Sequence, residues 1–268
     1  MLLQLRLLLI YQRVLIGMIE SIKDPVSGEL MEMAFSEVVL GKYDVQYYYS
    51  ENSGLLKTQT PFWLNEAYEE AISDKDIGLV RRNIRNANIL ELIISCLSID
   101  KNKFLDLAGG YGLLTRLMRD KGYDCYTTDK YCQNIFAKTF EPTEDFKVDV
   151  LFAFEVLEHI DEPLNFLSEM FDKYGTRTIV FSTLTFEKNI PSKDWWYYAF
   201  DTGQHITFYQ PRTLALMAER LGCNYYMLDS EFHVFTDKKL SFLSSLVITN
   251  KYFRKLYSVY LRIKRKLI

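Results

Sequence analysis

The sequence predicts an α/β fold in which helices cover a parallel sheet and a small β-rich module precedes it. Three observations carry this prediction. Strand and helix patterns alternate with short connections from residue 104 onward, and a glycine turn separates the first of these strands from its helix. Before them, β-branched and aromatic residues fill 35–49. Alternation of this kind is typical of a parallel sheet, because each strand is followed by a helix that can cross over it.

The elements follow from local patterns along the chain. Residues 35–49 predict two short strands around Gly41, and helical spacing predicts helices over 61–72, where a proline comes first, and over 79–98. Further strands are expected at 103–108, 124–128, 148–154 and 177–184, with helices at 111–121, 131–139, 162–173 and 211–221. Residues 224–237 predict one or two antiparallel strands, followed by a basic helical tail.

Composition restricts the classes of function. A chain of 268 residues that is 49% hydrophobic can form a sizeable core, which excludes global disorder. The formal net charge of −3 argues against nonspecific nucleic-acid binding, so no nucleic-acid partner is expected. The four cysteines are scattered and lack CxxC spacing, which indicates reduced thiols and a cytoplasmic protein.

Both termini leave alternatives open. Residues 1–18 are apolar but broken by Arg6 and Arg13, so they predict neither a membrane-spanning helix nor a secretory signal. They fit an amphipathic helix that packs on the domain or touches a membrane, or translation starts at Met18. The tail from Lys251 carries seven Lys and Arg residues and no acid. It suits peripheral contact with anionic lipid headgroups, an anionic substrate such as a nucleotide-sugar, or simply a solvated helix face.

The stretch LDLAGGYG, residues 105–112, is the strongest local signal. Gly109, Gly110 and Gly112 allow a sharp turn where side chains would block a ligand, and the helix that follows presents free N–H groups. A dinucleotide site requires G-x-G-x-x-G, but Leu113 occupies the third glycine position. Asp106 would repel a pyrophosphate and instead suits a cofactor with a positive centre and an ammonium group.

Two further segments reach the same rim of the predicted sheet. Asp129 ends the next strand, where an acid accepts hydrogen bonds from ribose hydroxyls. The stretch VDVLFAFEVLEHIDEP, residues 148–163, predicts a buried strand that ends at Glu155. Because ligands sit beyond the carboxyl ends of parallel strands, we expect Phe154, Glu155 and His159 to lie near the glycine turn. Helix capping or packing is an equally good interpretation of His159.

Residues 104–222 resemble a class I methyltransferase that depends on S-adenosylmethionine (SAM). LDLAGGYG resembles the first motif of that family, with Ala108 in place of the first glycine, and YTTDKY and FAFEVLEHIDEP resemble two later motifs. The segment GQHITFYQPRTLALMAERLG, residues 203–222, resembles a subgroup of sugar and small-molecule methyltransferases. The resemblance implies a Rossmann-like class I methyltransferase sheet flanked by helices, with a small N-terminal β-rich module and a helical lid.

The resemblance also implies roles for individual residues. Gly110 and Gly112 would line the methionine part of SAM, with Asp106 nearby, and Ala108 and Gly109 would belong to the same cofactor-binding turn. Asp129 would hold the ribose, Lys130 or Tyr131 would flank the adenine, and Phe154 and Glu155 would lie on the same rim. Tyr68, on the predicted lid helix, would face the pocket, although it also fits an ordinary core stripe.

Many relatives in this subgroup begin with a zinc module of the form CxxCG…CxxCG. Here DPVSG, residues 24–28, and SENSG, residues 50–54, keep both spacings and both glycines but lack the cysteines. Structural zinc requires Cys or His ligands, so we expect a degenerate zinc-ribbon-like module without a metal. Coincidence is the alternative, because serine and glycine are common in turns.

The acceptor side is the least constrained part of the site. Methyl transfer to oxygen or carbon usually needs a base, and the candidates are His159 and His205. The aromatic residues 195–198 are consecutive, so they cannot all face one core. Some of them would be exposed or would stack on a planar substrate or a sugar ring.

These observations predict a SAM-dependent methyltransferase acting on a small molecule, with a sugar or nucleotide-sugar in surface polysaccharide synthesis as the favoured acceptor. The alternatives are a non-catalytic SAM-binding or protein-interaction module, and an NAD-dependent oxidoreductase, which Asp106 and Leu113 disfavour. We expect four parts: an N-terminal segment and module over 1–60, a helical lid over 61–100, the SAM-binding domain over 101–240 and a basic tail over 241–268.

Overall fold

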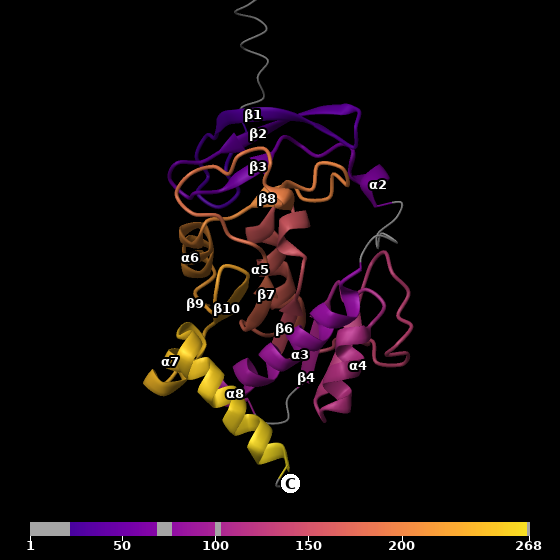
Figure 1. Ribbon diagram of the computed structural model, residues 1–268. Coiled ribbons are helices and arrows are strands. Elements are labelled where there is room, and N and C mark those ends of the chain that lie inside the picture. The colour runs from indigo at the N-terminus through magenta and orange to yellow at the C-terminus, as the bar shows by residue number, and fades with distance from the viewer. Residues whose placement is uncertain (1–21, 69–76, 100–102, 267–268) are drawn as a thin grey trace, which may run out of the picture.

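The computed structural model describes residues 22–68, 77–99 and 103–266. Two sheets organise the described chain, and Figure 1 places the small N-terminal sheet at the top with the larger sheet and its helices beneath it. The predicted helix over 1–18 lies outside the described residues.

The larger sheet has six strands in the order β5-β4-β6-β7-β10-β9. Its strands are β4 (Lys103–Leu107), β5 (Asp124–Thr128), β6 (Val150–Ala153), β7 (Ile179–Ser182), β9 (Asn224–Met227) and β10 (Phe232–Thr236). The first four in this order pair in parallel, and β10 runs antiparallel to both of its neighbours. The predicted parallel sheet is therefore confirmed, and 224–237 forms two antiparallel strands.

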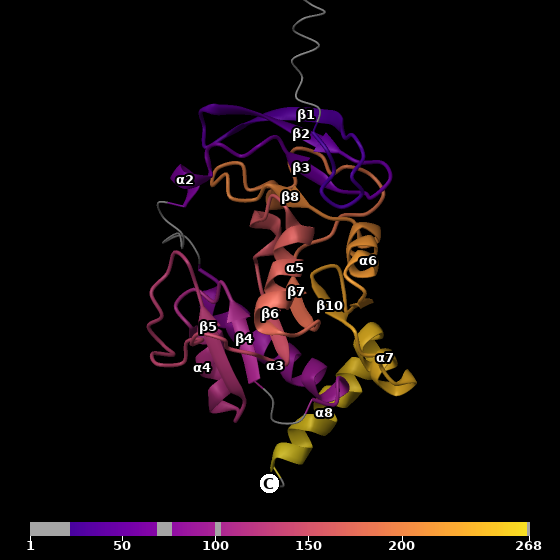
Figure 2. The same cartoon turned by 180° about the vertical axis from the view of Figure 1, so that it is seen from behind.

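Helices cover both faces of this sheet, as Figure 2 shows from behind. They are α3 (Leu79–Cys96), α4 (Leu113–Asp120), α5 (Pro163–Tyr174) and α6 (Pro211–Arg220). Side chains alternate along each strand: Leu105 and Leu151 pack with α5 and α6, whereas Phe104 and Phe152 pack with α3 and α4. Because both faces of the central strands are buried, β4, β6 and β7 are largely apolar. Asp106 interrupts one of them.

The small sheet is antiparallel, in the order β1-β2-β3-β8. Its strands are β1 (Glu32–Val39), β2 (Tyr43–Tyr49), β3 (Leu56–Thr58) and β8 (Thr207–Phe208). The last strand comes from the segment that leads into α6, so the N-terminal module and the late part of the chain share one sheet. Tyr47, Tyr198 and Phe208 are among the aromatic side chains that form its buried core. The four-part division of the chain stays a prediction.

The two glycine-terminated turns of this module come together around Asp24. Its carboxylate accepts hydrogen bonds from Val26 N–H at 2.7 Å and from the Ser27 hydroxyl at 2.6 Å. Burial raises the pKa of Asp24, but hydrogen bonds from Ser27, Ser53, Val26 and Ser50 outweigh that effect and lower it. The four positions expected to match zinc ligands therefore lie around one carboxylate.

The lid differs in part from the prediction. Of the helix expected over 61–72, the structure describes residues 61–68, and within these α2 (Leu64–Ala67) is helical; residues 69–76 lie outside the described residues. Trp63 anchors this segment, because its indole N–H donates to the Gly203 carbonyl at 2.8 Å. The longer α3 packs on the face of the larger sheet that carries Phe104 and Phe152, and it matches the helix predicted at 79–98.

The helix predicted over 131–139 is wrong. Asp129 does bond the Tyr131 and Cys132 N–H groups as a helix N-cap would, but no helix follows. The N–H groups of Ile135 and Phe136 both donate to the Tyr111 carbonyl instead of to the preceding turn. The Asn134 side chain bonds the backbone of Ala137 and closes a turn.

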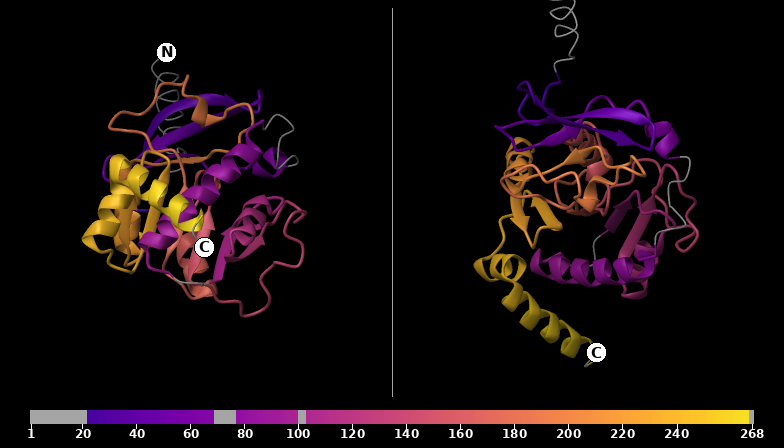
Figure 3. Two further views of the ribbon diagram at one scale, coloured as in Figure 1. Left: turned by 60° about the horizontal axis from the view of Figure 1, so that its bottom comes forward. Right: turned by 45° about the horizontal axis from the view of Figure 1, so that its top comes forward.

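The C-terminal helices are α7 (Phe242–Thr249) and α8 (Lys251–Lys266), which Figure 3 shows extending away from the sheet. Large apolar side chains on them are exposed, including Phe242, Leu243, Tyr252 and Leu256. No helix among the described residues is long and apolar enough to cross a membrane.

Candidate functional site

The glycine turn lies between β4 and α4 and has an unusual backbone. Ala108, Gly110 and Gly112 have positive φ angles of 51°, 56° and 79°. At Gly109 a Cβ atom would collide with Oγ1 of Thr127 and would lie 2.6 Å from Oδ2 of Asp106. Glycine is therefore required there for space, and the left-handed backbone at Ala108 is strain typical of a functional site.

Asp106 is a buried acid without a hydrogen-bond donor. Its side chain is 3% exposed, and no residue that the structure describes donates to its carboxylate. Burial, with a smaller contribution from the charge of Asp129, raises the pKa of Asp106 to about 8. A buried carboxyl group in this state favours a cationic or hydrogen-bond-donating ligand.

Asp129 joins the second strand to the glycine turn. Its Oδ2 accepts the Gly110 N–H at 2.8 Å, and its Oδ1 accepts the N–H groups of Tyr131 and Cys132, each at 2.8 Å. The Lys130 ammonium lies 5.1 Å from the centre of the Tyr131 ring. The structure therefore brings the predicted cofactor residues of β4, the glycine turn and β5 together.

Tyr68 lies at the rim of this site, as its predicted role requires. Its ring stacks on that of Tyr131, with centroids 4.7 Å apart and an interplanar angle of 2°. The Tyr68 ring also neighbours that of His159, and the centres of these two rings are 6.1 Å apart. Tyr131 itself is 54% exposed, so this stack forms part of the surface rather than the core.

Phe154 and Glu155 end the β6 side of the rim. Phe154 is half-buried and packs against Phe232, with ring centres 6.1 Å apart. Glu155 has a positive φ of 55°, and its Oε1 accepts the Ser182 hydroxyl at 2.7 Å. Burial raises the pKa of Glu155 despite this hydrogen bond. Neither residue contacts the glycine turn through a hydrogen bond.

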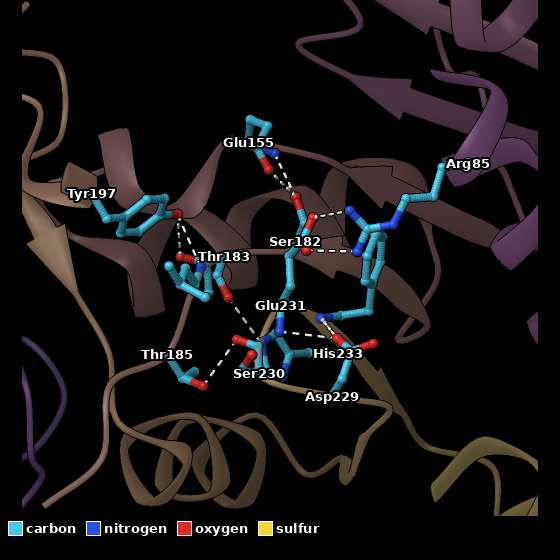
Figure 4. Close-up of polar contacts among 12 residues, drawn as sticks. Arg85, Glu155, Ser182, Thr183, Thr185, Tyr197, Asp229, Ser230, Glu231 and His233 are labelled. Atoms are coloured by element: carbon cyan, nitrogen blue, oxygen red, sulfur yellow. Dashed lines mark hydrogen bonds and ion pairs between the residues drawn. The ribbon is translucent and has the colours of Figure 1, made fainter. Parts of the chain in front are cut away.

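Figure 4 shows how polar contacts brace the carboxyl ends of β6 and β7. Arg85 of α3 forms two hydrogen bonds with Glu231, at 3.0 Å and 2.6 Å. His233 bonds the Thr183 carbonyl through Nε2 and the Tyr225 hydroxyl through Nδ1, each at 3.0 Å. Both nitrogens of this third histidine are occupied, which assigns it a structural role.

The two candidate bases lie side by side. The rings of His159 and His205 meet edge to face with centres 4.9 Å apart. Burial lowers the pKa of His159 to about 3, with a further contribution from His205, and lowers that of His205 to about 4. Both rings are therefore neutral at pH 7 and are weaker bases than a free histidine side chain.

The four consecutive aromatic residues divide between core and surface. Tyr197 and Tyr198 are buried, Trp195 packs against them, and Trp196 is 73% exposed. Tyr197 also contacts the edge of His205, with ring centres 4.6 Å apart. Only one of the four rings therefore presents a free face to solvent.

Two polar residues at the site were not among the site residues predicted from the sequence. Glu158 is fully buried beside the two histidines, and Oγ1 of Thr127 is buried without a hydrogen bond next to Gly109. The sequence did offer a signal for Glu158, because it precedes His159 directly and follows the acid that ends a buried strand. Thr127 carries no comparable signal.

Comparison with protein families identifies the fold and its class of activity. The family described as "Methyltransferase domain" matches residues 81–228, more than half of the chain. The chain belongs to this methyltransferase family. The match begins within α3 and includes the glycine turn, His159, His205 and β9, whereas Tyr68 lies outside it. The methyltransferase is thus of class I, with its six-stranded sheet flanked by helices.

Solved structures with a similar fold are distant in sequence. The 1,6-didemethyltoxoflavin N1-methyltransferase of Burkholderia thailandensis is 12% identical, with 75% of this chain and 97% of that chain covered and a TM-score of 0.49. A methyltransferase of Haloferax volcanii solved with its activator Trm112 is 15% identical, with 65% and 98% covered and a TM-score of 0.47.

The calicheamicin methyltransferase CalO1, solved with S-adenosylhomocysteine (SAH), is 11% identical, with 57% of this chain covered and a TM-score of 0.41. The chain described here spans only 54% of the length of the CalO1 chain. Comparison with curated proteins finds no match.

Proposed function

We propose that this methyltransferase transfers the methyl group of SAM to a small-molecule acceptor in the cytoplasm. The observation that carries the proposal is the buried Asp106 carboxyl group, which has no donor among the described residues and faces the glycine turn. Such a group fits the ammonium of SAM and does not fit a pyrophosphate. Membership of the methyltransferase family supports the same cofactor.

The residues present fit SAM at each part of the rim. Asp106 would orient the ammonium group, and Gly110 and Gly112 would leave room for the methionine part. Three N–H groups already occupy Asp129, which has about four acceptor positions, so it has capacity for about one ribose hydroxyl. Lys130, or Tyr131 with its stacked partner, would flank the adenine.

When bound, SAM supplies a methyl group on a sulfonium centre that is already activated for transfer. The protein then has to hold the acceptor in line and exclude water. His205 and His159 offer neutral rings on the acceptor side, where they would accept a hydrogen bond from an acceptor hydroxyl. Their low pKa values make full proton removal by either ring alone unfavourable at neutral pH.

A sugar or nucleotide-sugar of surface polysaccharide synthesis is the acceptor we favour. The exposed face of Trp196 supports it, because flat aromatic faces stack on sugar rings. SAH formation with a panel of nucleotide-sugars, compared between wild type and Trp196→Ala, tests this choice. We expect turnover with one acceptor and a raised KM in the variant. Turnover confined to acceptors without a sugar would refute it.

The N-terminal module is, in our proposal, a zinc ribbon whose metal has been replaced by hydrogen bonds. Asp24 occupies one ligand position and accepts a hydrogen bond from Ser27 of the same turn, while Ser50 and Ser53 of the other turn lower its pKa. This arrangement gives the carboxylate the partners that a cation would otherwise provide.

A peripheral membrane contact through the C-terminal helices is a further part of the proposal. Phe242, Leu243 and Leu256 are exposed there, and the same segment is rich in Lys and Arg. Sedimentation with vesicles of anionic and of neutral phospholipid tests it. We expect binding only to the anionic vesicles, with loss in Phe242→Ser/Leu243→Ser. Equal recovery of the wild-type protein in the supernatants of the anionic and the neutral vesicles would refute it.

A further inference from the structure

Three potential ligand residues meet next to the cofactor rim. Glu158 and His159 lie in η1 (Leu157–His159), a 3-10 helix of one turn. His205 lies in the loop before β8. Ile206 N–H donates to the Glu158 carbonyl at 2.8 Å and holds the two segments together. One potential ligand atom from each of the three side chains lies within 4.8 Å of the others.

The Glu158 side chain is the least satisfied group in this cluster. It is 0% exposed, and neither carboxylate oxygen has a hydrogen-bond partner among the described residues. The hydroxyls of Tyr197 and Thr183 approach the Glu158 carboxyl group, but neither meets hydrogen-bond geometry with it. They contact each other at 3.3 Å, and the Tyr197 hydroxyl also accepts the Leu184 N–H at 3.0 Å. A buried carboxylate without a partner is unfavourable unless a ligand satisfies it.

The two imidazoles are oriented as metal ligands are. Nδ1 of His159 lies 2.9 Å from the Gln204 carbonyl, and Nδ1 of His205 lies 2.7 Å from the Tyr197 carbonyl. A carbonyl only accepts, so each Nδ1 carries the proton and each Nε2 keeps its lone pair. Histidine ligands of metals typically donate their second N–H to a backbone carbonyl in this way. His233, by contrast, has partners at both nitrogens.

We propose that Glu158, His159 and His205 together bind one divalent transition-metal cation. Two imidazoles and one carboxylate suit Zn²⁺, Co²⁺ or Mn²⁺, whereas Mg²⁺ and Ca²⁺ prefer sites made of oxygen ligands. Three protein ligands leave a coordination position open for an exogenous oxygen.

The position of the cluster indicates what the cation would do. The Tyr68 ring lies 6.1 Å from that of His159 and stacks on Tyr131, which follows Asp129 closely in the chain. The Tyr68 ring would therefore lie between the cation and the cofactor residues, and the cation would be on the acceptor side. There it would bind an acceptor hydroxyl and lower the pKa of that hydroxyl, which the weakly basic histidines cannot do. This role rests on the proposed function, whereas metal binding itself does not.

Titration of the chelator-treated full-length protein with Co²⁺, followed by visible absorption and by calorimetry, tests the site. We expect one equivalent to bind to wild type with a visible absorption band typical of nitrogen and oxygen ligands. Glu158→Gln and His205→Gln each remove one ligand and should weaken binding by roughly a hundredfold or more. His233→Gln removes the histidine outside the cluster and should bind Co²⁺ like wild type.

Three results would overturn the proposal. They are no saturable Co²⁺ binding to wild type, unchanged affinity in both Glu158→Gln and His205→Gln, and displacement of Co²⁺ by an equal concentration of Mg²⁺. Circular dichroism shows which variants fold, and the ligand variant that folds decides the result. SAH titration separates this proposal from the proposed function: Glu158→Gln should keep SAH binding, whereas Asp129→Ala should weaken SAH binding and keep Co²⁺ binding.

Discussion

Oδ2 of Asp129 accepts the backbone N–H of Gly110 at 2.8 Å, so the end of β5 is tied directly to the glycine turn after β4. The Gly109 N–H also donates to the Thr128 carbonyl at 3.1 Å, so two hydrogen bonds join the strand ends that would hold the cofactor. The same carboxylate also fixes the start of the segment after β5 through two further N–H groups. Asp129 therefore shapes the turn, and in the proposed function it would also hold the ribose of SAM.

Gly109→Ala should weaken cofactor binding and stability together. The added methyl would collide with Thr127 Oγ1 and the Asp106 carboxylate, and overpacking of this kind costs about 1–3 kcal/mol in free energy of unfolding. Thermal unfolding and SAH titration measure the two effects.

Gly122→Ala is the control for this substitution. Gly122 has a positive φ of 88°, but nothing lies within 4 Å of the place that an added methyl group would take. Alanine there should therefore lower stability through the backbone alone. SAH affinity should stay at the wild-type level in this control. Equal loss of SAH affinity in both variants would mean that the crowding at Gly109 has no bearing on the cofactor.

Asp106→Asn should stabilise the protein increasingly as the pH rises from about 4 to about 8. Burial raises the pKa of Asp106 from its ordinary 3.8 to about 8. In this interval the folded state holds a proton that the unfolded state has released, so the wild type loses stability as the pH rises. Asparagine does not titrate, and the difference should grow by about 1.4 kcal/mol per pH unit.

Urea unfolding of both proteins at several pH values across this interval measures that difference. His159, His205 and His233 have lowered pKa values and act with the opposite sign, but they are common to both proteins and cancel in the comparison. A difference that is constant with pH would show that Asp106 is ionised in the folded state.

Tyr68→Ala should weaken SAH binding, because it removes the ring that stacks on Tyr131. Aromatic pairs contribute about 0.5–1.5 kcal/mol, and Tyr68→Phe should retain that contribution. Calorimetry measures SAH affinity in these variants, in Tyr131→Ala and in the double variant Tyr68→Ala/Tyr131→Ala. This double-mutant cycle gives the coupling free energy of the two rings. If phenylalanine at position 68 were as damaging as alanine, the hydroxyl rather than the ring would matter.

If the N-terminal module derives from a zinc ribbon, as proposed, it should bind a metal when cysteines are introduced at the four matching positions. A variant combining Asp24→Cys, Ser27→Cys, Ser50→Cys and Ser53→Cys should bind one Zn²⁺ per chain under reducing conditions, because four thiolates suit tetrahedral zinc. Elemental analysis after gel filtration measures the metal. Ser27→Cys/Ser50→Cys alone is the control, with one thiol in each turn. A folded quadruple variant without zinc would contradict a zinc-ribbon origin.

Much of the fold could be predicted because strand and helix signals are local. The alternation after residue 104 and the proline that begins α5 are visible in the sequence. The failed helix over 131–139 shows the limit: its N–H groups bond the Tyr111 carbonyl, which is a contact from the glycine turn rather than a local one. Likewise, no pattern in the sequence indicates that β8 completes the N-terminal sheet.

The candidate site divides in the same way. Asp106, the glycines and Asp129 could be found because their roles depend on their places at strand ends. The properties of the histidines could not, because their lowered pKa values result from burial by segments distant in the sequence. The sequence signal for Glu158 was only its place beside His159, because the burial of its carboxyl group and its proximity to His205 depend on the tertiary packing.

Calorimetric titration with SAH tests the cofactor site most directly, on wild type, Asp129→Ala and the exposed-residue control Asp172→Ala. We expect saturable one-to-one binding to wild type and to the control. Asp129→Ala should weaken it by about 1–3 kcal/mol, as expected for the loss of a charged hydrogen-bond partner. Absence of SAH binding to the folded wild-type protein, or undiminished binding to Asp129→Ala, would contradict the assignment of this rim as the SAM site.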